Sequence, residues 1–379
     1  MNINTTYTPA HLFVRQINSL TPMRGVAAIW VMLFHIDVSL FYRGFGSLLP
    51  RDQTGLFSKG YLWVDFFFLL SGFVIAHVYS QQLNSALRKA AIKNYLWARF
   101  SRLYPLHIFT LGVLVIFTQL IEHWYPAVVD GSWTTYFAWS ALPSNLMLTQ
   151  AMNQHTYLSW NMVSWSIAAE WWTYVISIPS IIFLIGRTKK FTLVYAMLFF
   201  ALLVGLVFSL PEKNLDITFN YGFFRCLFEF NIGLALYQLF LRDTIKQFLA
   251  QDYVAVTLVL IIAAAFHTHG PDLLVVPFFG LLILALAYNR TKVEALLNKS
   301  LFQYLGKISY SIYMTHCLWF MVFWFALPQL KLIGVVEFST VEKIFYAFAF
   351  VGLTLISSHF SYYYIELKCQ RKLLALFNR

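Results

Sequence analysis

A series of apolar runs, each long enough to cross a lipid bilayer, constrains this chain more than any other feature. A spanning helix needs about 20 mostly apolar residues, and only helices and closed barrels satisfy their backbone hydrogen bonds in hydrocarbon. Only 11% of the residues are charged and 59% are hydrophobic. We predict an all-α, polytopic membrane helical bundle of about ten transmembrane helices, at 20–41, 61–80, 100–121, 162–185, 191–210, 221–241, 253–268, 273–289, 309–327 and 343–366. The Gly270-Pro271 turn leaves a re-entrant pair open for 253–268 and 273–289.

The positive charges are divided unevenly between the predicted loops. With the N-terminus in the cytoplasm, most of the 27 lysines and arginines fall on the cytoplasmic side, and the long outer loop 122–160 has none. The positive-inside rule therefore predicts cytoplasmic N- and C-termini. Topology and attraction to anionic membrane lipids account for the net charge of +11, so we expect no nucleic-acid partner.

The predicted spans leave little chain for other domains. We expect a cytoplasmic N-terminal segment at 1–16, a single transmembrane domain at 17–366 and a basic cytoplasmic tail at 367–379. Residues 1–16 lack the residue order of a cleavable secretion signal, which indicates that the first span is an uncleaved anchor. The three cysteines have no metal-ligand spacing, so neither a metal site nor a disulfide framework is expected.

The first span carries two basic residues on one face. Arg24 lies at its predicted cytoplasmic end, and His35 follows eleven residues later, close to three helical turns and about 16 Å deeper. An arginine at a span end is typical of a topology anchor. A histidine at that depth indicates either a functional site or a satisfied interhelical hydrogen bond.

Two acidic residues are expected at the depth of His35, in the outer half of the membrane. Asp65 in the second span lies where a contact with His35 would fix the imidazole tautomer, and the alternative is a pair with an outer cation. Glu170 shares a helix face with Ser166 and Tyr174. The layer predicts proton chemistry, with a structural polar network as the alternative.

The cytoplasmic layer is cationic. Arg99 and Arg102 form an RxxR pair at the start of the third span, at the level expected for Arg24. Planar guanidinium groups converging on one level suit phosphate groups. The alternative is that these residues are ordinary positive-inside anchors.

Two more polar sets lie within spans. Ser309, Tyr313 and His316 form a stripe that reaches mid-membrane, and for His316 packing and binding stay equal alternatives. Arg225 and Glu229 are four residues apart on one helix, which predicts an internal ion pair.

Together these residues form a set of motifs that resembles a known family. The motifs are Arg24-x10-His35, VDFFFLLSGF at 64–73, the RxxR of 99–102 followed by LYP, SWSIAAEWWTY at 164–174, and ISYSIYMTH at 308–316. In this order, over about 18 to 366, they resemble the bacterial acyltransferase type 3 family of integral membrane O-acyltransferases. The resemblance implies transfer of an acyl group, usually acetyl, from cytoplasmic acyl-coenzyme A to hydroxyls of lipid-linked sugars, surface polysaccharides or small glycosides. Some members continue into a fused periplasmic hydrolase-like domain, which we expect this chain to lack.

The resemblance also implies roles for single residues. His35 matches the essential histidine of the family, Glu170 its acid, and Arg24, Arg99 and Arg102 its arginines on the coenzyme side. The family often ends its last span with Ile-Glu-x-Pro, whereas Lys368 stands here in place of the proline, which puts a role for Glu366 in doubt.

The residues and the resemblance lead to one expected function. We expect a multi-pass O-acyltransferase of the bacterial inner membrane that uses acetyl-coenzyme A or another acyl-coenzyme A and no metal. Its catalytic residues would be His35, Glu170 and Asp65, its donor-binding residues Arg24, Arg99 and Arg102, and its substrate-binding residues Trp165, Ser166, Tyr174, Tyr313 and His316. The acceptor would be a lipid-linked or surface glycan, and the oligomeric state, a homo-oligomer included, stays open. The alternative is a secondary transporter of a small anionic or sugar-like solute, which also needs buried ionisable groups.

Overall fold

The computed structural model describes residues 17–377, and their regular secondary structure is helical. The α-helices are α1 (Leu20–Arg43), α2 (Trp63–Leu83), α3 (Arg88–Trp124), α4 (Gly131–Tyr136), α5 (Leu142–Leu146), α6 (Trp165–Ile176), α7 (Ile178–Leu184), α8 (Lys189–Ser209), α9 (Gly222–Phe240), α10 (Lys246–Leu249), α11 (Asp252–His267), α12 (Val275–Tyr288), α13 (Lys292–Leu297), α14 (Ser300–Lys307), α15 (Ser309–Leu332), α16 (Thr340–Ser361) and α17 (Lys368–Phe377). Short 3-10 turns lie at Gly60–Leu62, Pro126–Val128, Trp139–Ala141, Met162–Ser164 and Asp272–Leu274. A π-helical turn at Tyr362–Leu367 joins α16 to α17. The predicted all-α class is confirmed, while the segment 1–16 lies outside the described residues.

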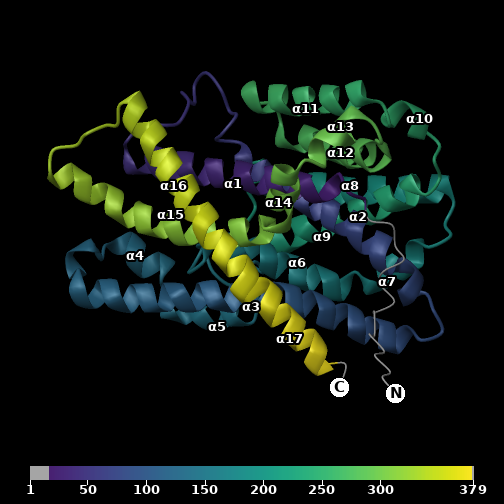
Figure 1. Ribbon diagram of the computed structural model, residues 1–379, viewed down its shortest axis with the longest axis horizontal. Helices are drawn as coiled ribbons and strands as arrows, with labels where there is room; N and C mark the ends of the chain where they lie inside the picture. The colour runs from purple at the N-terminus through teal and green to yellow at the C-terminus, as the bar shows by residue number, and fades with distance from the viewer. Residues whose placement is uncertain (1–16, 378–379) are drawn as a thin grey trace, which may run out of the picture.

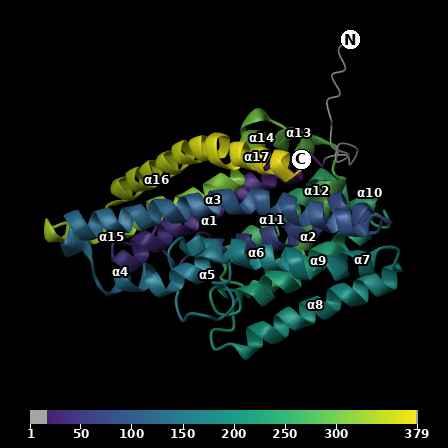
Figure 2. The same ribbon diagram turned by 90° about the horizontal axis from the view of Figure 1, so that it is seen from below.

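The bundle is layered. Helices α1, α2, α3 and α15 run along its long axis, and the rod formed by α16 and α17 crosses them obliquely (Figure 1). In the perpendicular view α8 forms one face and α16 the opposite face, with α1, α2 and α9 between them (Figure 2). Side chains that converge from α1, α2, α6, α9 and α15 are therefore enclosed by other helices.

Six helices in the described part of the chain are long and apolar enough to cross a membrane, and seven if one bent pair counts as a single span. That pair is Met162–Ile176 with Ile178–Leu184, bent by 55°. Each predicted run contains a helix, but α11 and α12 with its preceding turn are shorter than a full span, and α9 carries buried charges. A multi-pass membrane bundle follows, and the count of ten and the cytoplasmic termini stay predictions.

Glycines allow the closest helix contact of the core. Gly72 of α2 faces the backbone carbonyl of Phe230 in α9, and Gly233 of α9 faces that of Leu69 in α2, so a methyl group at either glycine would overlap the facing backbone. Small residues let helix backbones approach in this way inside membranes. The contact brings the polar side chains of α2 and α9 together.

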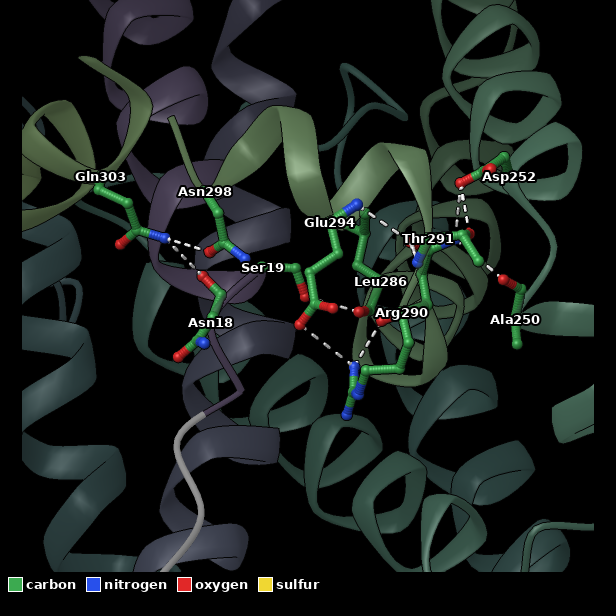
Figure 3. Close-up of polar contacts among 11 residues, drawn as sticks. Asn18, Ser19, Ala250, Asp252, Leu286, Arg290, Thr291, Glu294, Asn298 and Gln303 are labelled. Atoms are coloured by element: carbon green, nitrogen blue, oxygen red, sulfur yellow. Dashed lines mark hydrogen bonds and ion pairs between the residues drawn. The ribbon is translucent and has the colours of Figure 1, made fainter. Parts of the chain in front are cut away.

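Polar contacts anchor the start of α1, the helix that carries Arg24 and His35 (Figure 3). Ser19 Oγ donates to the carbonyl of Leu286 in α12 over 2.6 Å. Asp252 at the start of α11 accepts from Thr291 Oγ1 over 2.8 Å, just before α13. The short helices and the start of α1 thus form one hydrogen-bonded junction at this end of the bundle.

Candidate active site

A cavity at the junction of α1, α2, α3, α6 and α15 is lined by three arginines, and we call it the arginine cavity. It encloses about 820 Å3, including its open mouth, and Arg24, Arg99 and Arg102 contribute to its wall. Among the described residues, none of the three lies within 4.0 Å of a carboxylate oxygen. The structure therefore brings together the arginines that the sequence placed at one level, with no close carboxylate taking up their charge.

Neighbouring groups hold this cationic wall in place. Arg99 Nη2 donates to the hydroxyl of Tyr79 over 3.0 Å, and its guanidinium lies 5.3 Å from the centre of that ring. The charges of Arg24 and Arg102 act on each other, and the buried carboxylate of Glu366 offsets both. Mutual repulsion favours an anionic ligand between such groups.

Glu366, the buried carboxylate that offsets the charges of Arg24 and Arg102, is a residue whose role the sequence left in doubt. The π-helical turn carries it, and it accepts from Ser311 Oγ over 2.9 Å. π-helical turns are rare and are often found at functional sites. The sequence indicated this residue through Ile365-Glu366, the half of the Ile-Glu-x-Pro signature that the chain retains.

Glu170 belongs to the arginine cavity. Its carboxylate accepts from the hydroxyls of Ser71, over 2.6 Å, and Tyr174, and these two hydroxyls lie 2.8 Å apart. His35 does not line this cavity. The structure therefore places Glu170 and His35 in different cavities, and a common depth for His35, Asp65 and Glu170 stays a prediction.

His35 lines a second cavity, which we call the histidine cavity. It encloses about 1110 Å3, including open space, and its wall includes Phe34, Trp165, Asp216 and Phe320. His35 Nδ1 lies 2.9 Å from the carbonyl oxygen of Val31 and 3.2 Å from Nε2 of His316. The interhelical partner of His35 is thus a second histidine on α15.

Asp65 is bound by Arg225, so the predicted contact between Asp65 and His35 is wrong. Arg225 Nε and Nη2 donate to the two carboxylate oxygens of Asp65 over 2.8 and 2.7 Å, and both side chains are about 1% exposed. The expected pair of Arg225 with Glu229 is also wrong, because the fork of Arg225 is occupied by Asp65 and Glu229 lies beside that carboxylate instead. The close approach of α2 and α9 selects the interhelical partner.

The two cavities share part of their walls, and we call this shared wall the partition. Val64 and Tyr313 line both of them. The Tyr313 hydroxyl lies 2.7 Å from Ser166 Oγ and 3.2 Å from the carbonyl oxygen of Val163, which holds the ring in place. Tyr313 is therefore a fixed part of the wall between the arginines and the cavity of His35.

The remaining predicted substrate-binding residues do not gather in one cavity. Ser166 and Tyr174 line the arginine cavity, and Trp165 lines the histidine cavity. His316 is fully buried and lines neither. The sequence missed Arg51, which lies on the histidine cavity beside Asp37, and Ser71, which stands within the motif at 64–73.

Fold and site define a helical membrane protein with two cavities, one lined by three arginines and one by a histidine, that share Val64 and Tyr313 in their walls. The chain belongs to the acyltransferase 3 family, whose profile, described as an acyltransferase domain, matches residues 17–362. The family resemblance drawn from the motifs is confirmed, and the helices long and apolar enough to cross a membrane fit a multi-pass membrane protein of this family.

Two relatives are similar to part of the chain. Acyltransferase MdmB of Streptomyces mycarofaciens is 32% identical over 167 residues, which cover 43% of this chain and 38% of that protein. Protein 2 in picA locus of Rhizobium radiobacter is 37% identical over 98 residues, which cover 26% of this chain and 44% of that protein. Each match spans less than half of the relative. No solved structure matches the chain.

Proposed function

We propose that this protein is an O-acyltransferase of the bacterial inner membrane that moves an acyl group, expected to be acetyl, from acyl-coenzyme A to a hydroxyl of a cell-envelope glycan or glycolipid. One observation carries the proposal: a cavity with three arginines meets, at Tyr313, a cavity that holds the imidazole of His35. Coenzyme A is polyanionic at one end and carries its thioester at the other. The arginines suit the polyanionic end, and the wall at Tyr313 would bring the thioester end close to His35.

The donor would bind in the arginine cavity. Arg24, Arg99 and Arg102 would hold its phosphate groups, for which planar forked donors are well suited. The hydroxyls of Ser71 and Tyr174, fixed by Glu170, line the same wall and suit the amide groups of the pantetheine arm. The thioester would then lie next to Tyr313.

The acceptor would bind in the histidine cavity. Trp165 offers an aromatic face on which a sugar ring packs. Polar groups at 214, 216 and 218 line the same wall and suit further hydroxyls. An acceptor hydroxyl in this cavity would face His35.

Transfer would then proceed by general base catalysis. His35 takes the proton of the acceptor hydroxyl while its oxygen attacks the thioester carbonyl carbon, and a tetrahedral intermediate forms. When the intermediate collapses, the carbon–sulfur bond breaks and the proton passes from His35 to the departing thiolate. A positioned general base contributes about 10²–10⁴-fold to such a rate. An acyl-histidine intermediate is the alternative route.

The partition has a role in this scheme. The Tyr313 ring must move aside for the thioester to meet the hydroxyl, and in its resting position it keeps water in the histidine cavity away from the thioester. Asp65, which was predicted to be catalytic, would instead fix the histidine cavity wall through Arg225.

The second candidate is a secondary transporter of a small anionic or sugar-like solute. The observation that favours it is the same partition, because two cavities that share a wall at Val64 and Tyr313 suit alternating access. A transporter would move its solute and form no ester.

One experiment tests the proposal and separates the two candidates. The purified protein is reconstituted in lipid vesicles with radiolabelled acetyl-coenzyme A and a panel of lipid-linked and free glycans, and base-labile label on the glycans is measured. We expect label that depends on both acceptor and protein and is lost in the His35→Gln variant. Uptake of a solute without any labelled ester would overturn the proposal in favour of transport.

A further inference from the structure

His316 is a buried titratable residue for which the mechanism above has no use. It lies on α15, is fully buried and contacts neither cavity, so it cannot bind a substrate in either. Its Nε2 lies 3.2 Å from Nδ1 of His35, and its Nδ1 lies 3.1 Å from the carbonyl oxygen of Ile312. The ring centres are 4.8 Å apart and the ring planes are tilted by 54°, so the two rings are not stacked.

The backbone carbonyls assign the protons of this pair. A carbonyl oxygen only accepts, so the contact of His35 Nδ1 with Val31 O requires a proton on that nitrogen. By the same argument His316 Nδ1 carries a proton toward Ile312 O. In a neutral His316 the Nε2 atom is then unprotonated, and its lone pair accepts a hydrogen bond from His35 Nδ1–H.

This assignment leaves one nitrogen of His35 for chemistry. Its Nε2 carries no proton and has no hydrogen-bond partner among the described residues, and the ring lines the histidine cavity. That is the atom a general base needs on the acceptor side.

We propose that His316 is a positioning residue for His35. It holds His35 in the Nδ1–H tautomer, orients Nε2 toward the acceptor, and stabilises the imidazolium that forms when Nε2 takes the hydroxyl proton. A carboxylate would perform the same task, but a buried charge costs several kcal/mol of desolvation in this setting, whereas a neutral imidazole does not. The inference rests on the proposed general-base function of His35.

Three substitutions at this position separate positioning from packing. His316→Leu fills a similar volume and has no acceptor. His316→Gln places an amide oxygen near the position of Nε2. His316→Asn is polar but too short to reach His35, which makes it the matched control for polarity. Size-exclusion profiles and thermal unfolding in detergent check that each variant folds.

The readout is the acyl-transfer rate of the reconstituted protein at saturating donor and acceptor. We expect kcat to fall at least about 10-fold in His316→Leu and His316→Asn. The fall should not exceed the about 10²–10⁴-fold that the general base itself contributes. In His316→Gln we expect kcat to recover largely. KM for either substrate should stay within about twofold in all three, because His316 lines neither cavity; a rise in KM beyond that would assign His316 to substrate binding and overturn positioning. In a His35→Gln background, His316→Leu should add no further loss, because the two residues act as a unit.

Two further results would overturn the inference. One is an equal loss in the Gln, Asn and Leu variants, which is the pattern of a packing residue. The other is that His316→Leu lowers kcat in the His35→Gln background by the same factor as in the unmodified protein. If His316→Leu does not fold, the comparison of Gln with Asn decides alone. Failure of the proposed function looks different, because the unmodified protein would then form no ester.

Discussion

Replacing Arg102 by alanine removes one of the three guanidinium groups of the arginine cavity. No carboxylate oxygen of the described residues lies within 4.0 Å of it, so the substitution breaks no ion pair inside the protein. The loss should therefore appear mainly in donor binding, with a smaller loss of stability because the buried carboxylate of Glu366 keeps only Arg24 to offset its charge. A hydrogen bond to a charged group contributes about 1.5–3 kcal/mol, which corresponds to a rise in KM for acyl-coenzyme A of about 10- to 150-fold.

A truncated donor makes this prediction specific to phosphate. Acyl-pantetheine carries the thioester and the amide groups without any phosphate. With that donor, Arg102→Ala should change KM by less than about twofold, because the contact removed by the substitution is already missing from the ligand. Initial rates of acyl transfer are measured for both proteins with both donors, as in a double-mutant cycle.

The control is Arg290→Ala, which removes an arginine that lines neither cavity. We expect this variant to leave KM unchanged for both donors. An equal loss with acyl-coenzyme A and acyl-pantetheine would refute the reasoning, since Arg102 would then act through the shape of the cavity and not through phosphate.

Three further predictions concern the partition and the core. Tyr313→Ala should join the two cavities and raise acceptor-independent hydrolysis of the donor, measured as free thiol release, while Tyr313→Phe keeps the ring and the low rate. Asp65→Ala should lower the stability by about 3–5 kcal/mol in denaturant unfolding by stranding the charge of Arg225, whereas the double change to Asp65→Leu and Arg225→Met should cost less; an equal cost would argue against the buried pair. Gly72→Ala should lower stability by about 1–3 kcal/mol through overlap with the facing helix, and Gly112→Ala, which meets nothing within 4 Å, should not; equal behaviour of the two glycines would contradict the close contact.

The sequence predicted the bundle well because its signals are local. Apolar runs of sufficient length specify helices in a membrane whatever their neighbours are, and each run contains a helix in the structure. The arginine cluster was also predictable, since Arg99 and Arg102 share one face of α3 and Arg24 begins the neighbouring stripe.

Partners across helices were not predictable in the same way. The periodicity of one helix says which residues share a face, but it does not say which helix packs against that face. Asp65 pairs with Arg225 because glycines bring α2 and α9 together, and His35 pairs with His316 because α1 packs against α15. The sequence also could not show that Glu170 and His35 line different cavities, because that depends on how α6 and α1 pack against their neighbours.

The central claim is that acyl transfer takes place at His35, between a donor in one cavity and an acceptor in the other. The most direct measurement is single-turnover transfer from bound radiolabelled acetyl-coenzyme A to an acceptor glycan, comparing the unmodified protein with His35→Gln at equal donor occupancy. We predict that the donor binds equally well to both proteins and that ester formation falls by about 10²–10⁴-fold in the variant. An unchanged single-turnover rate in His35→Gln would contradict the account.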